Sequence, residues 1–186
     1  AAMAERILVI GMTSVLPLSD DRNNNDVQVE GRTDSFVAER RFTTPNYFEA
    51  LGIRIVEGRS YTAEDDRPDG PGVAVISEGL ARAAFPGQSA VGKRLTYWGN
   101  RETRIVGVAA DVRDESIQEG TTLAFYVPRR QARQIYGTIV LATTGDRSAL
   151  IPGIRAAMRE VDASMPIIAI QPLTDLLREQ TASQRY

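Results

Sequence analysis

The spacing of apolar residues between Arg41 and Arg59 predicts a short helix flanked by two strands. Tyr47, Phe48 and Leu51 recur at helical spacing, so one face of this helix is apolar. Such a face belongs to a hydrophobic core more often than to a ligand pocket. The pattern contains no arrangement of reactive side chains, and we interpret the stretch as a structural joint.

The same stretch contains signals for the beginning and the end of the helix. Thr44 is a suitable N-cap, and Pro45 falls at the first helical position, where its missing N–H costs nothing. Gly52 can adopt the positive φ of the residue that follows a helix. The β-branched residues at 53–56 then predict a strand that ends at Gly58.

Runs of β-branched and aromatic residues predict that strands make up most of the remaining chain. These strands are expected over 6–18, 27–29, 36–43, 73–76, 91–98, 102–109, 123–127, 138–143 and 167–170. The strands 91–98 and 102–109 are expected to pair across a turn at 99–100. Polar and acidic turn-forming residues predict loops over 20–26 and 61–72.

Apolar stripes and caps predict three further helices. The first spans 78–85, with Ser77 as its N-cap. The second spans 148–161, and we interpret its apolar stripe as core; the stripe consists of Ile151, Ile154, Met158 and Val161. The third begins at Pro172 and contains Leu173, Leu176 and Leu177.

The order of these elements indicates an α+β fold. A β-α-β pattern near the C-terminus matches a β-β-α-β pattern near the start of the chain. We therefore expect one split α/β layer lobe, formed by residues 1–59 and 137–186. Residues 60–136 would be inserted into it as a second, more β-rich lobe.

Composition removes several kinds of chemistry. The 186 residues include no cysteine, which excludes disulfides, thiolate nucleophiles and zinc–thiolate sites. They also include no histidine, the commonest general base and transition-metal ligand. Catalysis would have to use carboxylates, Lys93, tyrosines or hydroxyl groups. The net charge of −2 gives no general attraction to nucleic acid or an anionic membrane.

Three polar clusters are candidate binding sites for cations. Asp111, Asp114 and Glu115 could contribute to a magnesium site, and so could Glu64, Asp65 and Asp66. Without further ligands, solvated loops are the favoured interpretation of both. The loop with Asp21, Asn23 and Asn25 has the alternation of a calcium site, but Asp26 and Arg32 replace the required Gly and Glu. We predict no metal there.

Arginines provide the candidate anion site. Arg129, Arg130 and Arg133 could hold phosphate, but no aromatic residues alternate with them. Arg40-Arg41 is another basic pair in the sequence. We expect no nucleic-acid binding. The sequence contains no G-x-x-x-x-G-K-[ST], G-x-G-x-x-G, G-x-S-x-G or S-x-x-K motif, so neither nucleotide binding nor serine hydrolysis has motif support.

Short motifs occur in a defined order along almost the whole chain. They are FTTPNYFEALGIRIVEGRSYTAEDD at 42–66, VAVIS at 73–77, FPG at 85–87, AVGKR at 90–94, IVGV at 105–108 followed by Asp111-Val112, FYVP at 125–128 with Gln131, VDASMP at 161–166 and SQRY at 183–186. In this order they resemble the MacB-like periplasmic core domain of ABC transporter permeases, a group that includes FtsX-like proteins. Most of these positions are glycines, turn prolines and apolar strand residues, which specify a scaffold.

The resemblance implies a two-lobed domain with a porter-like α+β lobe, on the extracytoplasmic (periplasmic) side of the bacterial cytoplasmic membrane. Both membrane helices next to the domain would lie outside this sequence, which has no run of about 18–20 apolar residues. The implied partners are a second permease copy or a related half, a cytoplasmic ABC ATPase and a periplasmic or outer-membrane protein. The implied role is mechanotransmission or efflux without catalysis, catalytic residues, metal or cofactor.

Two alternative functions belong to other classes. A stand-alone extracytoplasmic binding module for a peptide, lipid or small molecule would need one deep apolar pocket with a few polar groups. A carboxylate or metal enzyme would need Asp111 and Asp114 to converge with another acidic residue in a cleft.

Overall fold

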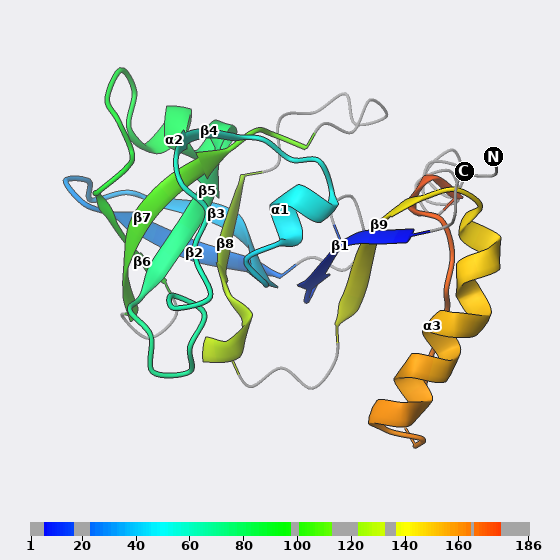
Figure 1. The fold of residues 1–186 in the computed structure, drawn as a ribbon. Helices are drawn as coiled ribbons and strands as arrows, with labels where there is room; N and C mark the ends of the chain where they lie inside the picture. The colour runs from blue at the N-terminus through cyan, green and yellow to red at the C-terminus, as the bar shows by residue number, and fades with distance from the viewer. Residues whose placement is uncertain are drawn as a thin grey trace, which may run out of the picture. The chain divides into compact units, whose positions relative to one another are not determined.

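Strands dominate the fold. The computed structural model describes residues 6–16, 23–97, 101–112, 123–132, 137–164 and 166–175. The strands in this part of the chain are β1 (Arg6–Thr13), β2 (Asn24–Val29), β3 (Ser35–Thr43), β4 (Ile55–Gly58), β5 (Val73–Ser77), β6 (Arg94–Tyr97), β7 (Arg101–Ala109), β8 (Ala124–Pro128) and β9 (Thr138–Thr144). The helices are α1 (Tyr47–Ala50), α2 (Glu78–Ala84), α3 (Arg147–Val161) and the 3₁₀-helix η1 (Arg129–Gln131) (Figure 1). This mixture confirms the predicted α+β class.

The chain divides into two compact units. Unit 1 contains residues 1–9 and 141–186, and unit 2 contains residues 10–140. Unit 2 holds β2 to β8, α1 and α2, whereas α3 belongs to unit 1. The predicted organisation, with residues 1–59 and 137–186 in one lobe and residues 60–136 in the other, remains a proposal.

Six strands of unit 2 pair in a closed ring. Hydrogen-bonded neighbours follow the order β2-β6-β7-β5-β8-β3, and β3 pairs with β2 again. The pairs β3–β8 and β5–β7 are parallel, and the other pairs in the ring are antiparallel. Closure gives each of these strands a partner on both sides, so the ring is a small β-barrel.

The two nine-residue strands, β3 and β7, each divide one edge between two partners. β3 pairs with β2 along residues 35–39 and with β1 at Thr43, while its other edge pairs with β8. β7 pairs in the same manner with β6 and β4 on one edge and with β5 on the other. The strands β1 and β4 therefore attach to the ring at the ends of its two longest members.

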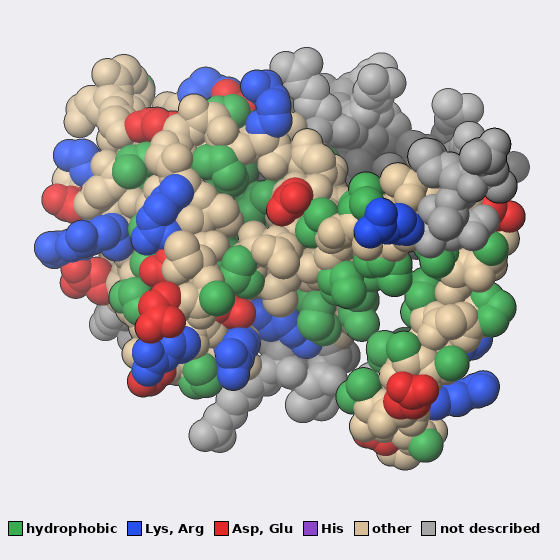
Figure 2. All heavy atoms as spheres, viewed as in Figure 1, with side chains coloured by type: hydrophobic (Ala, Val, Ile, Leu, Met, Phe, Trp, Pro, Cys, Tyr) green, Lys and Arg blue, Asp and Glu red, His purple; other side chains and the backbone are tan. Residues whose placement is uncertain are grey.

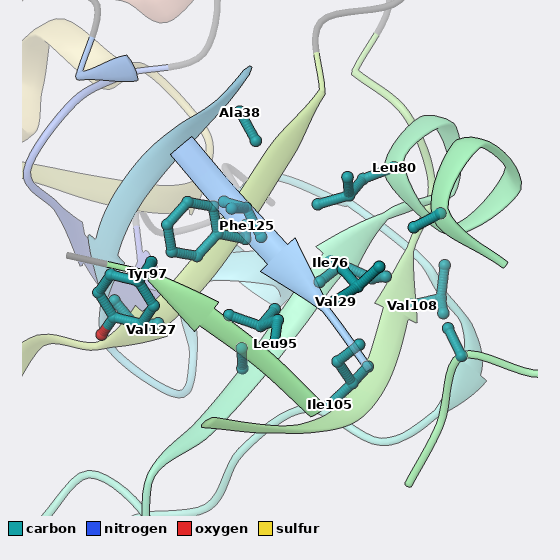
Figure 3. Packing of buried hydrophobic residues seen from close by; sticks show 14 of the residues in the cluster. Val29, Ala38, Ile76, Leu80, Leu95, Tyr97, Ile105, Val108, Phe125 and Val127 are labelled. Carbon is teal, nitrogen blue, oxygen red and sulfur yellow. The ribbon is translucent and has the colours of Figure 1, made fainter. Parts of the chain in front are cut away.

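The barrel interior is the main hydrophobic core, and every strand of the ring contributes to it. Alternate residues point inward, as the period of a strand requires (Figure 3). The contributors are Val27 and Val29 of β2, Ala38 and Phe42 of β3, Ala74 and Ile76 of β5, Leu95 and Tyr97 of β6, Ile105 and Val108 of β7, and Phe125 and Val127 of β8. The irregular spacing of Ile105 and Val108 follows from a register shift between β5 and β7.

A second core covers the outside of β5, β7 and β8. Tyr47 and Phe48 of α1 pack there with Tyr61 and Tyr126, and neighbouring ring centroids lie 5.0–6.1 Å apart. The prediction that the apolar face of the first helix belongs to a core is confirmed. Gly52 ends α1 with φ 68°, also as predicted.

Several predicted boundaries are wrong because long-range contacts override local sequence signals. The polar residues at 24–26 belong to β2, not to a loop, because they pair with 37–39 of β3. The N-cap of α1 is Asn46, and the Thr44 hydroxyl instead accepts a hydrogen bond from the Met12 N–H at 2.9 Å. β1 ends at Thr13, and β4 begins only at Ile55.

Two predictions about the C-terminal part are also wrong. Residues 167–170 form no strand, although their composition favours one, because β-propensity depends on a partner strand and on burial. The stripe of α3 is not core: none of its residues is buried, and Val161 is 80% exposed. Leu176 and Leu177, predicted on the last helix, lie outside the described residues.

Gly52→Ala and Gly58→Ala should differ in cost, although the two φ angles are 68° and 69°. At position 52 a Cβ meets open space, so the cost is that of the left-handed backbone, about 1 kcal/mol. At position 58 it would collide with the Val106 carbonyl oxygen, which should raise the total above about 2 kcal/mol. Urea unfolding measures both; equal midpoints would contradict this account of Gly58.

Candidate functional site

The strongest carboxylate candidate, Asp111, caps helix α2. Its Oδ1 accepts a hydrogen bond from the Gly79 N–H at 2.8 Å, and its Oδ2 pairs with Arg82 at 2.7 Å. A carboxylate at a helix N-terminus accepts hydrogen bonds from free backbone N–H groups, and its negative charge interacts favourably with the helix dipole. Asp114 and Glu115 lie outside the described residues. Asp111 therefore has a structural role in the part of the site that is described.

Ser77 completes the N-terminus of α2. Its Oγ accepts hydrogen bonds from the Leu80 N–H at 3.3 Å and from the Ala124 N–H at 3.1 Å. This confirms Ser77 as the predicted N-cap and also ties α2 to β8. Because Ser77 and Asp111 both accept bonds from the first turn, this helix end is occupied by side chains of the protein itself.

The acidic segment after β4 is held by ion pairs and backbone groups. Asp65 Oδ2 accepts hydrogen bonds from Arg59 Nη1 at 2.6 Å and from the Thr62 N–H at 2.8 Å. Burial works against the Asp65 charge, but the bonds from Arg59 and Thr62 outweigh it and lower its pKa. Glu64 pairs with Arg67 at 3.0 Å. These carboxylates stabilise the turn.

Asp66 connects the acidic segment to η1. Its Oδ1 accepts a hydrogen bond from the Arg130 N–H at 3.0 Å, and the residue is only 5% exposed. Burial raises the Asp66 pKa, while Arg130 and Arg129 oppose this shift. Gln131 Nε2 adds bonds to the carbonyl oxygens of Asp65 at 2.7 Å and Pro71 at 3.0 Å. The acidic motif and the FYVP…Q motif therefore meet in space.

The described members of the predicted clusters do not come together as metal ligands. Within the part of the chain that the structure describes, no three carboxylates gather closely enough to hold an ion. Of the calcium-like loop, Asn25 and Asp26 belong to β2, and Asp21 lies outside the described residues. Arg32, at the position where calcium loops need Glu, forms an exposed ion pair with Asp34 at 2.7 Å.

The predicted arginine cluster does not form a phosphate site among the described residues. Arg130 is exposed, Arg129 is half-buried beside Asp66, and Arg133 lies outside the described residues. On the face of unit 2 seen in Figure 2, basic and acidic side chains are interspersed and do not form a patch of one sign.

A joint connects β1 to the barrel, and we define it as residues 12–14 with residues 42–44. The Ser14 N–H donates to the Phe42 carbonyl oxygen at 2.8 Å, and the Thr44 N–H donates to the Met12 carbonyl oxygen at 3.0 Å. The bond from the Met12 N–H to the Thr44 hydroxyl adds a third link. These three bonds fix the end of β1 against the end of β3, whereas the interpretation of the whole stretch Arg41–Arg59 as a structural joint stays a prediction.

A buried ion pair lies on the outer face of β3. Arg41 Nη2 and Glu39 Oε2 are 2.6 Å apart, and their side chains are 4% and 6% exposed. Burial alone would lower the Arg41 pKa, but neighbouring Tyr126, Tyr47 and Glu39 outweigh it and raise the pKa. Burial also raises the pKa of Tyr47. The pair therefore lies close to Tyr47 of α1 and to Tyr126 of β8.

This pair is not apparent from the sequence pattern alone. Arg40 and Arg41 are adjacent basic residues in the sequence, but successive strand residues point to opposite faces. Arg40 lies over the Phe42 and Tyr97 rings, at 4.8 and 5.6 Å from their centroids, whereas Arg41 faces Glu39 and Tyr126. The available signal was a Glu and an Arg two residues apart in a predicted strand.

Solved structures with a similar fold include extracytoplasmic domains of transporters. The periplasmic region of MacB from Actinobacillus actinomycetemcomitans superposes with a TM-score of 0.63 at 20% identity, covering 83% of this chain and 67% of that one. The extracellular domain of the noncanonic ABC-type transporter YknZ from Gram-positive bacteria gives 0.56 at 14% identity, covering 78% and 70%. A domain of a putative permease from Porphyromonas gingivalis gives 0.57 at 16% identity, covering 92% and 82%. These identities establish the fold alone.

The fold is therefore one that is also found in extracytoplasmic domains of membrane transporters. Residues 3–161 match the MacB-like periplasmic core domain, and the chain belongs to this family. It is a periplasmic domain of a MacB-like ABC transporter permease, and its family is not a catalytic one. No curated protein matches the sequence. Within the described residues, no helix is long and apolar enough to cross a membrane.

Arg41→Met should be strongly destabilising because it leaves the buried Glu39 carboxylate without its partner. Loss of one member of such a pair costs about 3–5 kcal/mol, which urea unfolding at neutral pH measures. The double variant Glu39→Leu/Arg41→Met should recover part of this loss. The control is Arg32→Met in an exposed pair, which should leave the midpoint unchanged. A parent-like midpoint for Arg41→Met would refute a structural role for the pair.

Asp111→Ala should lower the free energy of unfolding by about 1 kcal/mol because α2 loses a cap. Magnesium or calcium should shift the melting temperature of the parent and the variant equally. Asp69→Ala, at a carboxylate whose side chain is 73% exposed, is the matched control and should have little effect. A cation-induced rise in the melting temperature that only the parent shows would revive the metal-site hypothesis.

Proposed function

We propose that this domain is a non-catalytic mechanical element, which couples movement of the permease membrane helices to export or mechanotransmission outside the membrane. The observation that carries the proposal is the course of β1 and β9. Each strand belongs in part to unit 1 and in part to unit 2, and the two are neighbours in the sheet. The two units are thus joined by two continuous strands, and displacement of one unit would reach the other through these strands.

The barrel is suited to move as one body. Its ring closes on itself, its interior is filled by side chains from all six strands, and a second core packs α1 against it. Close-packed interiors transmit displacement with little deformation. The joint at 12–14 and 42–44 fixes one of the two entering strands to this body.

The proposed partners follow from the family. In the full permease we expect a second copy or a related permease half beside this domain, and a cytoplasmic ABC ATPase that supplies the energy. A periplasmic or outer-membrane protein is a further proposed partner. We expect nucleotide-dependent movement of the membrane helices to be passed on to this domain.

The test measures whether the domains of two permease copies move with the ATPase cycle. Because this domain contains no cysteine, Ala156→Cys in unit 1 and Gln88→Cys in unit 2 give single, exposed labelling sites. Each variant of the full permease, freed of other cysteines and reconstituted with its ATPase, would carry a spin label for pulsed EPR. Distances between the two copies should change between the nucleotide-free and ATP-bound states at both sites.

A hydrolysis-deficient ATPase is the control, since it should hold the ATP-bound distance and prevent return to the resting one. Identical distance distributions in all nucleotide states, at both labels, would contradict the mechanical function. Saturable binding of a peptide, lipid or small molecule by the isolated domain would then favour the binding module.

A further inference from the structure

Arg129 lies where the two entering strands meet the barrel. Thr13 is the last residue of β1, and Gly137 immediately precedes β9. A Cβ built on Gly137 would lie 2.9 Å from Arg129 Nη1 and 2.9 Å from the Thr13 carbonyl oxygen. The guanidinium, the end of β1 and the start of β9 are therefore packed together, and residue 137 leaves room for this only because it is glycine.

Arg129 is also close enough to the acidic segment for its charge to interact with Asp66. Asp66 attracts its charge, and the Asp66 carboxylate is itself positioned by the Arg130 N–H at 3.0 Å. Gln131 holds the same segment through the carbonyl oxygens of Asp65 and Pro71. Several hydrogen bonds fix the acidic segment and η1 to each other. Arg129 thus connects this part of the barrel with the end of β1 and the start of β9.

We propose that Arg129 is a positioning residue that fixes the ends of β1 and β9 to the barrel and thereby passes displacement between the two units. The packing of Arg129 against Thr13 and Gly137 stands by itself, whereas the transmission role rests on the proposed function. An arginine suits this position because its rigid planar group carries several hydrogen-bond donors and keeps its charge when partly buried.

The first experiment measures local opening by amide hydrogen exchange in the isolated domain. Arg129→Ala should accelerate exchange of the Ser14 and Thr44 amides, whose bonds form the joint, by roughly tenfold. The amides of Glu30 and Arg104, bonded within the barrel, should exchange as in the parent. The matched control is Arg130→Ala, which keeps the backbone bond to Asp66 and should alter none of them.

A second variant keeps the proposal testable if Arg129→Ala fails to fold. Asp66→Asn removes the charge beside Arg129 but retains an oxygen that can accept from the Arg130 N–H. It should accelerate exchange at Ser14 and Thr44 in the same pattern and to a smaller extent. Parent-like exchange at both amides in the folded variants would overturn the packing role of Arg129.

The second experiment separates this inference from the proposed function, with the spin labels at positions 156 and 88. In Arg129→Ala permease, the label in unit 1 should still change distance with nucleotide, while the change at the label in unit 2 should be lost or broadened. If Arg129 had only a structural role, Arg129→Ala would lower stability, but the distances at both labels would still change with nucleotide. Movement at both labels as in the parent overturns the inference alone, whereas no movement in the parent overturns the proposed function.

Discussion

The second half of β3 is the constraint on which the rest of the domain depends. Residues 38–43 are buried on both faces, since alternate side chains enter the barrel interior and the outer core. The same strand pairs with β2, β8 and β1, and so closes the ring and anchors the joint. Glu39 and Arg41 can occupy its outer face only as a pair, because either charge alone would be desolvated without compensation.

Polar side chains that suggest chemistry in the sequence are used here to hold backbone segments together. Asp111 caps α2, Asp65 stabilises a turn, and Asp66 and Gln131 attach the acidic segment to η1. Their partners are backbone N–H or carbonyl groups and arginines of the same domain. This use of carboxylates and amides agrees with membership in a family of permease domains that has no catalytic role.

Sequence analysis predicted local features well where a single side chain or backbone preference decides the outcome. The Ser77 cap, the positive φ of Gly52 and the approximate positions of most strands are of this kind. It failed where a distant partner decides. Thr44 bonds to Met12 instead of capping α1, and the polar residues 24–26 form a strand because β3 supplies the ladder.

The sequence by itself determined the α+β class, the family, and the absence of histidine and cysteine chemistry. Composition can be counted without a structure, and each motif consists of residues close together in the chain. Only the tertiary structure decided that six strands close into a barrel, that Glu39 and Arg41 pair, and that Arg129 meets Thr13 and Gly137. Such features depend on strand register between segments far apart in sequence. Local propensity does not encode which strands pair with one another or which strands are buried on both faces.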